Sequence, residues 1–187
     1  MAIAPEPEPR YPEPPSDEVV GMSTLFERQL ATYASYHRDA RNRATHFIGI
    51  PAIVVSLMPV LALWSLSIGG VPVSGAWIVS IVAAIGWIAL DRSIGVAMAI
   101  VLVPMVLFGE WVAGFGAAAA WWTFAVLFVG GWVFQIVGHV AFEGRRPALL
   151  DNLFQAFIGP MFIMAETLMA FGLRRDLEGA INIQASH

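Results

Sequence analysis

The sequence predicts an all-α, polytopic membrane helical bundle. We expect four transmembrane helices, an N-terminal amphipathic helix and a C-terminal re-entrant or kinked helical segment. Of the 187 residues, 58% are hydrophobic and 13% are charged, whereas a soluble domain is about half apolar and about a quarter charged. The apolar residues gather in runs that suit membrane helices. We therefore expect one membrane-embedded domain at 23–175, between a leader (1–22) and a flexible tail (176–187).

The leader is rich in proline and glutamate and lacks the apolar residues of a core, so we expect it to be disordered. It contains no apolar segment of the signal-peptide type. The next residues, Thr24-Leu-Phe-Glu27, have the pattern of a capping box that begins a helix running to about Arg41. Apolar residues and His37 recur on one face of this helix, which predicts an amphipathic helix at the membrane surface.

Four hydrophobic segments follow, and a fifth is interrupted. They comprise residues 47–68, 75–90, 93–108, 117–142 and 153–173. The second and third are short for spans of about 17–25 residues, and Asp91-Arg92 between them predicts a tight hairpin. Gly159-Pro160 interrupts the fifth segment, which also carries Glu166. This dipeptide predicts a break at which a re-entrant or kinked segment turns back.

The arginines predict a cytoplasmic N-terminus. They precede the first span, separate the second from the third and follow the fourth, whereas residues 69–75 and 109–116 contain no lysine or arginine. A last segment that does not cross keeps Arg174-Arg175 on the same side. We therefore expect an integral membrane protein whose active site faces the cytoplasm. Its all-arginine basic set favours a bacterial inner (plasma) membrane; a eukaryotic host would place it in the endoplasmic reticulum.

Three histidines are predicted to meet at the cytoplasmic end of the bundle. His46 begins the first span, His139 lies near the end of the fourth, and His37 lies on the preceding surface helix. His139 and Glu143 are four residues apart and share one helix face. Polar groups in such a segment are costly and are candidates for function. The fourth histidine, His187, is the last residue, and we expect no role for it.

The spacing of His37 and His46 requires a bend if the two are to share a metal. Nine residues are about two and a half helical turns, which places the side chains on opposite faces of a straight helix. Thr45 could cap a new helix that begins at His46. Alternatively, Asn42, four residues before His46, could share its face if the helix continues. The sequence leaves both arrangements open.

Composition excludes several kinds of site. The chain has no cysteine, which excludes disulfides and thiolate metal sites, and no lysine, which excludes Schiff-base chemistry. It has no Gly-rich phosphate loop and no basic, aromatic patch, so we expect no nucleic-acid binding. Three imidazoles suit Fe(II), Zn or Cu. Four histidines are too few for a histidine-rich diiron centre, so a mononuclear site is the most that the chain can build.

Each polar residue also has a structural interpretation. A lone interfacial histidine is more often a hydrogen-bonded structural residue than a ligand. Glu143 could pair with Arg145 or Arg146, and Glu166 could pair with an arginine instead of a metal. Gln135 lies four residues before His139 and could simply bridge helices. The case for a site therefore depends on the convergence of the histidines.

Two separated motifs resemble the 2-hydroxy fatty acid dioxygenase family, small membrane proteins of fatty acid α-oxidation. The first motif is Tyr36-His37, four residues, Asn42, three residues, and His46-Phe-Ile-Gly49-Ile-Pro51. The second motif contains Trp132, Gln135, Gly138-His139, Glu143 and Pro147-Ala-Leu149, followed by Pro160 and Glu166. The resemblance covers about residues 24–173 and leaves out the leader.

This resemblance implies an Fe(II)-dependent enzyme that converts a 2-hydroxy long-chain fatty acid and O2 into the acid shortened by one carbon, CO2 and water. It implies His37, His46 and His139 as iron ligands. The other implied site residues are Glu143, Glu166 and Asn42 as further ligands or catalytic groups, and Arg145, Arg146, Gln135 and Tyr36 as substrate contacts. Arg38, Arg41 and Arg43 compete with Arg145 and Arg146 for the carboxylate.

Two other functions compete with this one. The first is a Zn-dependent membrane hydrolase with Glu143 or Glu166 as the general base. The second is a non-enzymatic lipid-binding or transport protein. Small residues such as Gly130-Gly131 would also permit a homo-oligomer in the bilayer.

Overall fold

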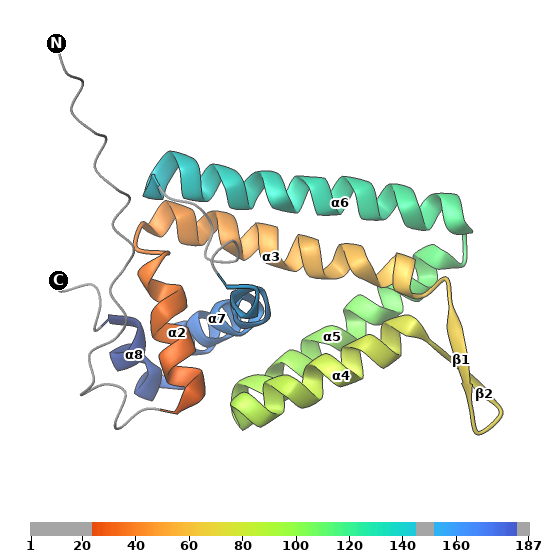
Figure 1. The fold of residues 1–187 in the computed structure, drawn as a ribbon, viewed down its shortest axis with the longest axis horizontal. Coiled ribbons are helices and arrows are strands. Elements are labelled where there is room, and N and C mark those ends of the chain that lie inside the picture. Colours follow the sequence, from red (N-terminus) through yellow and green to blue (C-terminus); the bar gives the residue numbers. More distant parts are fainter. Residues whose placement is uncertain (1–23, 145–151, 183–187) are drawn as a thin grey trace, which may run out of the picture.

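The computed structural model describes residues 24–144 and 152–182. This part of the chain is mostly helical, with one short β-hairpin (Figure 1). The disorder expected at 1–22 and the roles expected for Arg145, Arg146 and His187 concern residues outside the described ones. The elements in order are α2 (Leu25–Ser35), α3 (Ala40–Leu61), β1 (Ser65–Ile68), β2 (Val71–Ser74), α4 (Gly75–Leu90), α5 (Arg92–Ala113), α6 (Ala117–Val137), the π-helix η1 (Gly138–Glu143), α7 (Phe154–Ala170), the 3₁₀ helix η3 (Arg175–Leu177) and α8 (Glu178–Asn182).

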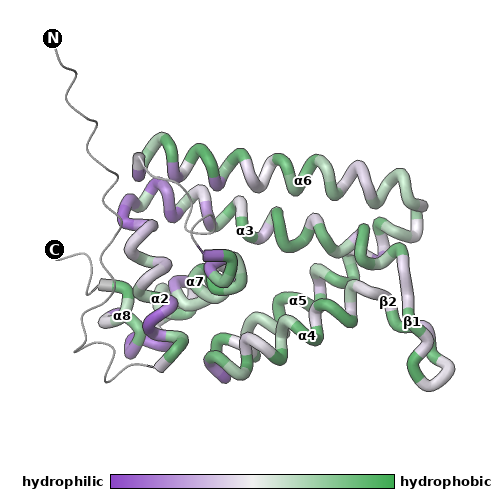
Figure 2. Tube along the Cα trace, viewed as in Figure 1, coloured by the Kyte–Doolittle hydropathy of each residue, from purple (hydrophilic) through white to green (hydrophobic). Residues whose placement is uncertain are grey.

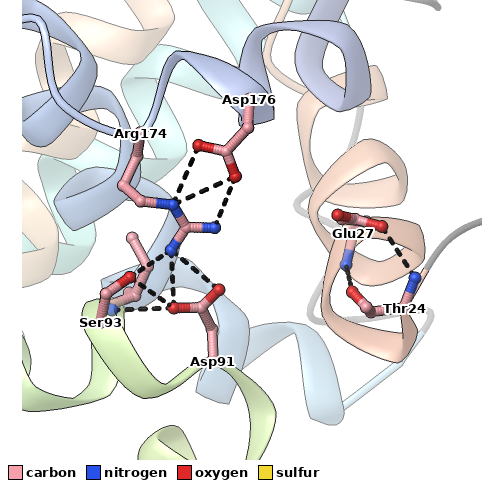
Figure 3. A network of polar contacts seen from close by, with 7 residues as sticks. Thr24, Glu27, Asp91, Ser93, Arg174 and Asp176 are labelled. Carbon is pink, nitrogen blue, oxygen red and sulfur yellow. Dashed lines mark hydrogen bonds and ion pairs between the residues drawn. The ribbon is translucent and has the colours of Figure 1, made fainter.

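The predicted capping box at the start of α2 is confirmed. The Thr24 hydroxyl accepts from the Glu27 N–H at 3.2 Å, and the Glu27 carboxylate accepts from the Thr24 N–H at 2.8 Å (Figure 3). The apolar face of α2, which includes Phe26, Leu30 and Tyr33, is buried, and α2 packs against α7 and α8. The face expected to meet the membrane surface is therefore covered by protein.

The prediction that the first helix runs to Arg41 is wrong. It ends at Ser35, because the Asp39 carboxylate caps a new helix by accepting from the Arg41 N–H at 2.8 Å. Thr45 is therefore not a cap, and the hydrogen-bonding of Asp39 to Arg41 lowers the pKa of the Asp39 carboxyl to about 2. The helical conformation is interrupted at residues 36–39. This interruption includes His37 and precedes His46, so the chain bends as the spacing of the two histidines requires.

Helices α3 and α6 run side by side along their lengths (Figure 1). Two glycines allow this approach: a Cβ atom on Gly131 would lie 2.8 Å from the Gly49 carbonyl oxygen and 2.7 Å from the Ile53 side chain. The first span ends at Leu61 rather than at Ile68, because residues 65–68 pair with 71–74 as an antiparallel hairpin. The prediction of a purely helical chain therefore missed this hairpin.

The predicted tight turn between the second and third hydrophobic segments is confirmed. Helix α4 has the expected bounds, and α5 extends to Ala113, further than residue 108. Asp91 caps α5 by accepting from the Ile94 N–H at 2.9 Å. It also forms an ion pair with Arg174 at 2.7 Å, and Arg174 contacts Ser93 and pairs with Asp176 at 2.9 Å (Figure 3). This network ties the corner between α7 and η3 to the α4–α5 turn.

The break predicted at Gly159-Pro160 is wrong. Helix α7 continues through Pro160, and the chain bends by 117° only between α7 and the η3–α8 segment. Gly172 and Arg174 in this corner have φ angles of 78° and 52°, which a right-handed helix cannot contain. The polar anchoring of Arg174 holds its unusual backbone conformation in place. A bent C-terminal helical segment is therefore present, but its turn lies further along the chain.

The apolar helices place this chain among membrane proteins. Helices α3, α5 and α6 with η1 are long and apolar enough to cross a membrane, and the bent α7–α8 pair could supply one more span. Helix α4 is also apolar but has 16 residues. Hydrophilic residues gather where α2, α8 and the start of α3 lie (Figure 2). Many large apolar side chains elsewhere are exposed, as expected for contact with lipid.

The contact of α3 with α6 yields a matched pair of variants. We expect Gly131→Ala to destabilise the protein by about 1–3 kcal/mol, because the added methyl group overlaps the α3 backbone. Gly130→Ala adds the same atom where, apart from its chain neighbours and the backbone of its own helix, no described atom lies within 4 Å. It should be neutral or stabilising by up to about 1 kcal/mol. Thermal unfolding in detergent measures both, and equal effects would contradict the packing described.

Candidate metal centre

Three buried imidazoles from three separate elements meet at one point. His37 comes from the α2–α3 connection, His46 from α3 and His139 from η1. The Nε2 atoms of His37 and His46 are 3.0 Å apart, and those of His46 and His139 are 3.1 Å apart. Exposed fractions of 2%, 1% and 1% remove all three rings from solvent. The predicted convergence of the histidines is therefore present in the fold.

The hydrogen bonds of two rings determine which nitrogen carries the proton. His37 Nδ1 lies 2.7 Å from the Tyr33 carbonyl oxygen, and His46 Nδ1 lies 2.8 Å from the Asn42 carbonyl oxygen. A carbonyl oxygen only accepts, so each Nδ1 donates and each neutral ring keeps a lone pair on Nε2. Two lone pairs at 3.0 Å repel each other unless a cation lies between them.

A metal ion suits this arrangement. Metal-bound histidines usually donate their second N–H to a carbonyl or carboxylate, as His37 and His46 do. Adjacent nitrogen ligands on a metal at about 2.0–2.1 Å and near a right angle lie about 3 Å apart. Burial, and then the nearby His46, hold the pKa of His37 well below its usual value, which favours the neutral ligand form. The ligand nitrogens of all three rings lie within 4.8 Å of one another.

The third ring depends on a π-helical turn. His139 lies in η1, which continues α6 with a wider helical turn. The close approach of η1 to α3 requires Gly138, because a Cβ atom there would overlap Thr45 and Asn42 side-chain oxygens. His139 Nδ1 has no hydrogen-bond partner among the described residues. Its second nitrogen thus differs from those of the other two rings.

Glu143 holds η1 against the start of α3. Its Oε1 atom accepts from the Asp39 N–H at 2.7 Å and from Asn42 Nδ2 at 3.2 Å. The carbonyl of the same Asn42 orients His46. The sequence predicted Glu143 and Asn42 as catalytic residues or further metal ligands. In the structure they form a chain of contacts that leads to His46. Glu143 does not belong to the group of three side chains that could share an ion.

Glu166 pairs with an arginine, as the structural interpretation allowed. Its Oε1 atom lies 3.0 Å from Arg43 Nη1 in a partly buried ion pair between α7 and α3. It also lies outside the three-histidine group. Arg41 is engaged with Asp39. Arg41 and Arg43, two of the three arginines that could compete for a substrate carboxylate, therefore already have carboxylate partners.

A cavity of about 110 Å³ opens beside the imidazoles. Its walls are mostly apolar and come from α2, α3, α6, η1 and α7. The lining residues are Tyr33, His37, His46, Ile50, Ile53, Val54, Trp132, Gln135, His139, Gln155, Ala156, Gly159 and Pro160. The structure places Gln135 in this wall but does not place Tyr36 there; the Tyr36 carbonyl oxygen instead lies 3.4 Å from Asn42 Nδ2.

Sequence reasoning missed two residues of the site. Tyr33 stacks on His37, with ring centroids 4.1 Å apart and planes 5° apart, and its carbonyl orients the same ring. Burial, and then the charge of Glu166, raise the pKa of the Tyr33 hydroxyl, so it stays protonated. Tyr33 lies four residues before His37, and this helical spacing could have indicated that the two side chains are neighbours. Gln155 also lines the cavity, and a polar residue in the apolar run 153–173 could have revealed it.

Comparisons with known proteins identify a family and a curated relative. A family model described as "2-hydroxy-palmitic acid dioxygenase Mpo1-like" matches residues 23–171. The 2-hydroxy-palmitic acid dioxygenase MPO1 of Saccharomyces cerevisiae is 50% identical over 56 residues, which are 29% of this chain and 32% of the yeast protein. The match thus spans about a third of the length of this curated relative. No solved structure matches the chain.

The contacts of Glu143 predict a role in positioning. Glu143→Leu should weaken metal binding by about 10–100-fold, because it releases Asn42 and the start of α3. Glu143→Gln should keep most of the affinity, since a single oxygen accepts both bonds. Anaerobic metal titration of the purified protein measures these affinities.

Glu110→Leu is the matched control. Glu110 accepts a hydrogen bond from Ser74 where the β-hairpin meets α4 and α5. The Glu110→Leu variant should therefore bind metal as the wild type does. A loss in Glu143→Gln as large as in Glu143→Leu would contradict the positioning role and favour a direct ligand or base.

Proposed function

This chain belongs to the Mpo1-like 2-hydroxy-palmitic acid dioxygenase family, and from that premise we propose that it is an Fe(II)-dependent dioxygenase of fatty acid α-oxidation. The proposed reaction is RCH(OH)COOH + O2 → RCOOH + CO2 + H2O. The substrate loses four electrons, which reduce O2 completely, so the balance requires no outside reductant. The observation that carries the proposal is the trio of buried imidazoles with facing Nε2 atoms.

His37, His46 and His139 would hold the metal. Iron bound there would supply the one-electron chemistry that lets O2 react with a closed-shell acid. The tautomers favoured by the Tyr33 and Asn42 carbonyls keep two Nε2 lone pairs available without any proton loss. Stacking of Tyr33 on His37 and the contacts of Glu143 restrict the rings further. The protein thus contributes a pre-organised set of nitrogen ligands.

The cavity beside the imidazoles would receive the reacting end of the substrate. Ile50, Ile53, Val54 and Trp132 form an apolar wall that suits methylene groups and excludes water. The cavity is too small for a whole long-chain acid, so the remaining acyl chain would lie between helices or in the bilayer. Tyr36, Arg145 and Arg146 remain proposed substrate contacts.

The membrane setting of the proposal follows the arginine pattern. We propose that the polar end formed by α2, α8 and the start of α3 faces the cytoplasm (Figure 2). Four crossings and a bent last segment fit this orientation. An inner membrane would contain the protein in a bacterium, and the endoplasmic reticulum in a eukaryote. Self-association through small residues of α6 also stays a proposal.

A zinc hydrolase is the second candidate, because three nitrogen ligands suit zinc as well. Such an enzyme needs a carboxylate or another base free to activate water. Glu143 is engaged with Asp39 and Asn42, and Glu166 with Arg43. These contacts favour the dioxygenase. A lipid-binding protein without a catalytic centre would not require the facing Nε2 atoms.

Replacing the histidines tests the proposal. We expect His37→Ala, His46→Ala and His139→Ala each to reduce turnover of 2-hydroxy-palmitic acid at least about 1,000-fold and to lower the iron content, because each removes one ligand. His187→Ala is the matched control and should retain activity. Formation of pentadecanoic acid with Fe(II) and O2 measures turnover, and metal analysis of anaerobically purified protein measures iron.

Two results would contradict the proposal. One is stoichiometric zinc together with an activity that does not depend on O2, which would favour the hydrolase. The other is full function in all three variants while they remain folded, which would favour a lipid-binding protein.

A further inference from the structure

Two glutamines from different helices line the cavity. Gln135 lies on α6 and Gln155 on α7, and both line the cavity beside the imidazoles. Their exposed fractions are 6% and 2%. Four buried side-chain atoms of the described residues lack a hydrogen-bond partner, and three of them belong to cavity-lining residues: Gln135 Nε2, His139 Nδ1 and Gln155 Oε1. Unpartnered polar atoms therefore concentrate at this one place.

Such atoms point to a ligand. Native proteins pair the great majority of their buried polar groups, because an unpaired group loses its water without compensation. A binding pocket is the usual exception, since its few polar groups wait for the ligand that they orient. An apolar cavity with two unpartnered amide atoms and a metal-type histidine cluster fits a ligand with a small polar head and an apolar body.

The two amides offer opposite hydrogen-bonding groups. Gln155 Nε2 donates to Gln29 Oε1 at 2.7 Å, and this contact with α2 leaves Gln155 Oε1 as an acceptor. Gln135 Nε2, the other unpartnered amide atom, lies close to Gly49 of α3 and can only donate. A carboxylate only accepts, so it can pair with Gln135 but not with Gln155. A hydroxyl group can donate to Gln155 Oε1.

We propose that Gln155 is the residue that selects a 2-hydroxy acid over a plain fatty acid, by accepting a hydrogen bond from the 2-hydroxyl group, while Gln135 donates to the carboxylate. The assignment rests on the proposed function, whose substrate class it explains. Gln29 is a positioning residue that holds the Gln155 amide in the accepting orientation.

The assignment also predicts weaker binding of the product than of the substrate. The shortened acid keeps a carboxylate and can still pair with Gln135, but it has lost the 2-hydroxyl group. Gln155 Oε1 then stays unpaired in a buried site, which weakens product binding. The same acceptor therefore discriminates against plain fatty acids before the reaction and against the product after it. Sites that hydrogen-bond a substrate hydroxyl reject analogues that lack it far better than apolar pockets do.

Equilibrium binding without O2 tests the assignment apart from turnover. Labelled 2-hydroxy-palmitic acid and palmitic acid are titrated onto the full chain with its metal under anaerobic conditions. We expect the wild type to prefer the 2-hydroxy acid about 10–100-fold, from one buried hydrogen bond. Gln155→Met should bring this ratio close to one, by weakening binding of the 2-hydroxy acid while binding of palmitic acid stays the same or improves.

Gln135→Met is the matched control. Both acids carry a carboxylate, so this change should weaken the binding of both about equally and leave the ratio unchanged. Gln29→Met leaves the cavity wall intact and should lower the ratio part of the way, which tests the assignment even if Gln155→Met does not fold. Thermal unfolding and metal content of each variant exclude a general loss of structure.

The assignment would be overturned if Gln155→Met kept the wild-type preference for the 2-hydroxy acid. If Gln155→Met does not fold, the same result in Gln29→Met would overturn it. It would also be overturned if Gln135→Met, rather than Gln155→Met, abolished the preference. A wild type that binds with the expected ratio but forms no shortened acid with O2 would contradict the proposed function instead. The binding ratios and the turnover assay thus separate the two failures.

Discussion

The mutual repulsion of lone pairs on facing Nε2 atoms is the constraint on which the rest of the structure depends. Two of the three imidazoles donate their Nδ1 protons to main-chain carbonyls, so their Nε2 atoms face each other at 3.0 Å with no proton between them. Burial raises the free energy of placing a proton there, and a divalent cation resolves the conflict. The helix break before α3, the glycines between α3 and α6, and the π-helical turn all bring these atoms together.

Much of the fold could be predicted from the sequence, because long apolar runs and a capping box are strong local signals. The bounds of α4 and the start of α2 followed from them. The sequence could not decide where the first helix breaks, since Asp39 and Thr45 are both good caps. The bend after α7 was also missed, because continuity through Pro160 and the anchoring of Arg174 depend on tertiary contacts.

The candidate site was predictable to the extent that topology controls it. Helices that alternate direction bring residues near corresponding ends together, and this placed His37, His46 and His139 at one level. Side-chain partners were harder to predict. Glu143 contacts Asp39 and Asn42 across more than a hundred residues of sequence, and Gln155 meets Gln29 across α2 and α7. Periodicity carries no information about such contacts, which depend on how α2, α3 and α7 pack.

Iron K-edge X-ray absorption of the anaerobically reconstituted protein tests the central claim most directly. Imidazole rings bound through nitrogen give characteristic outer-shell scattering from their ring carbons, which distinguishes them from carboxylate or water ligands. The account predicts bound Fe(II) with outer-shell scattering from the three imidazoles of His37, His46 and His139. Iron surrounded by oxygen ligands without imidazole scattering, or no retention of iron at all, would contradict it.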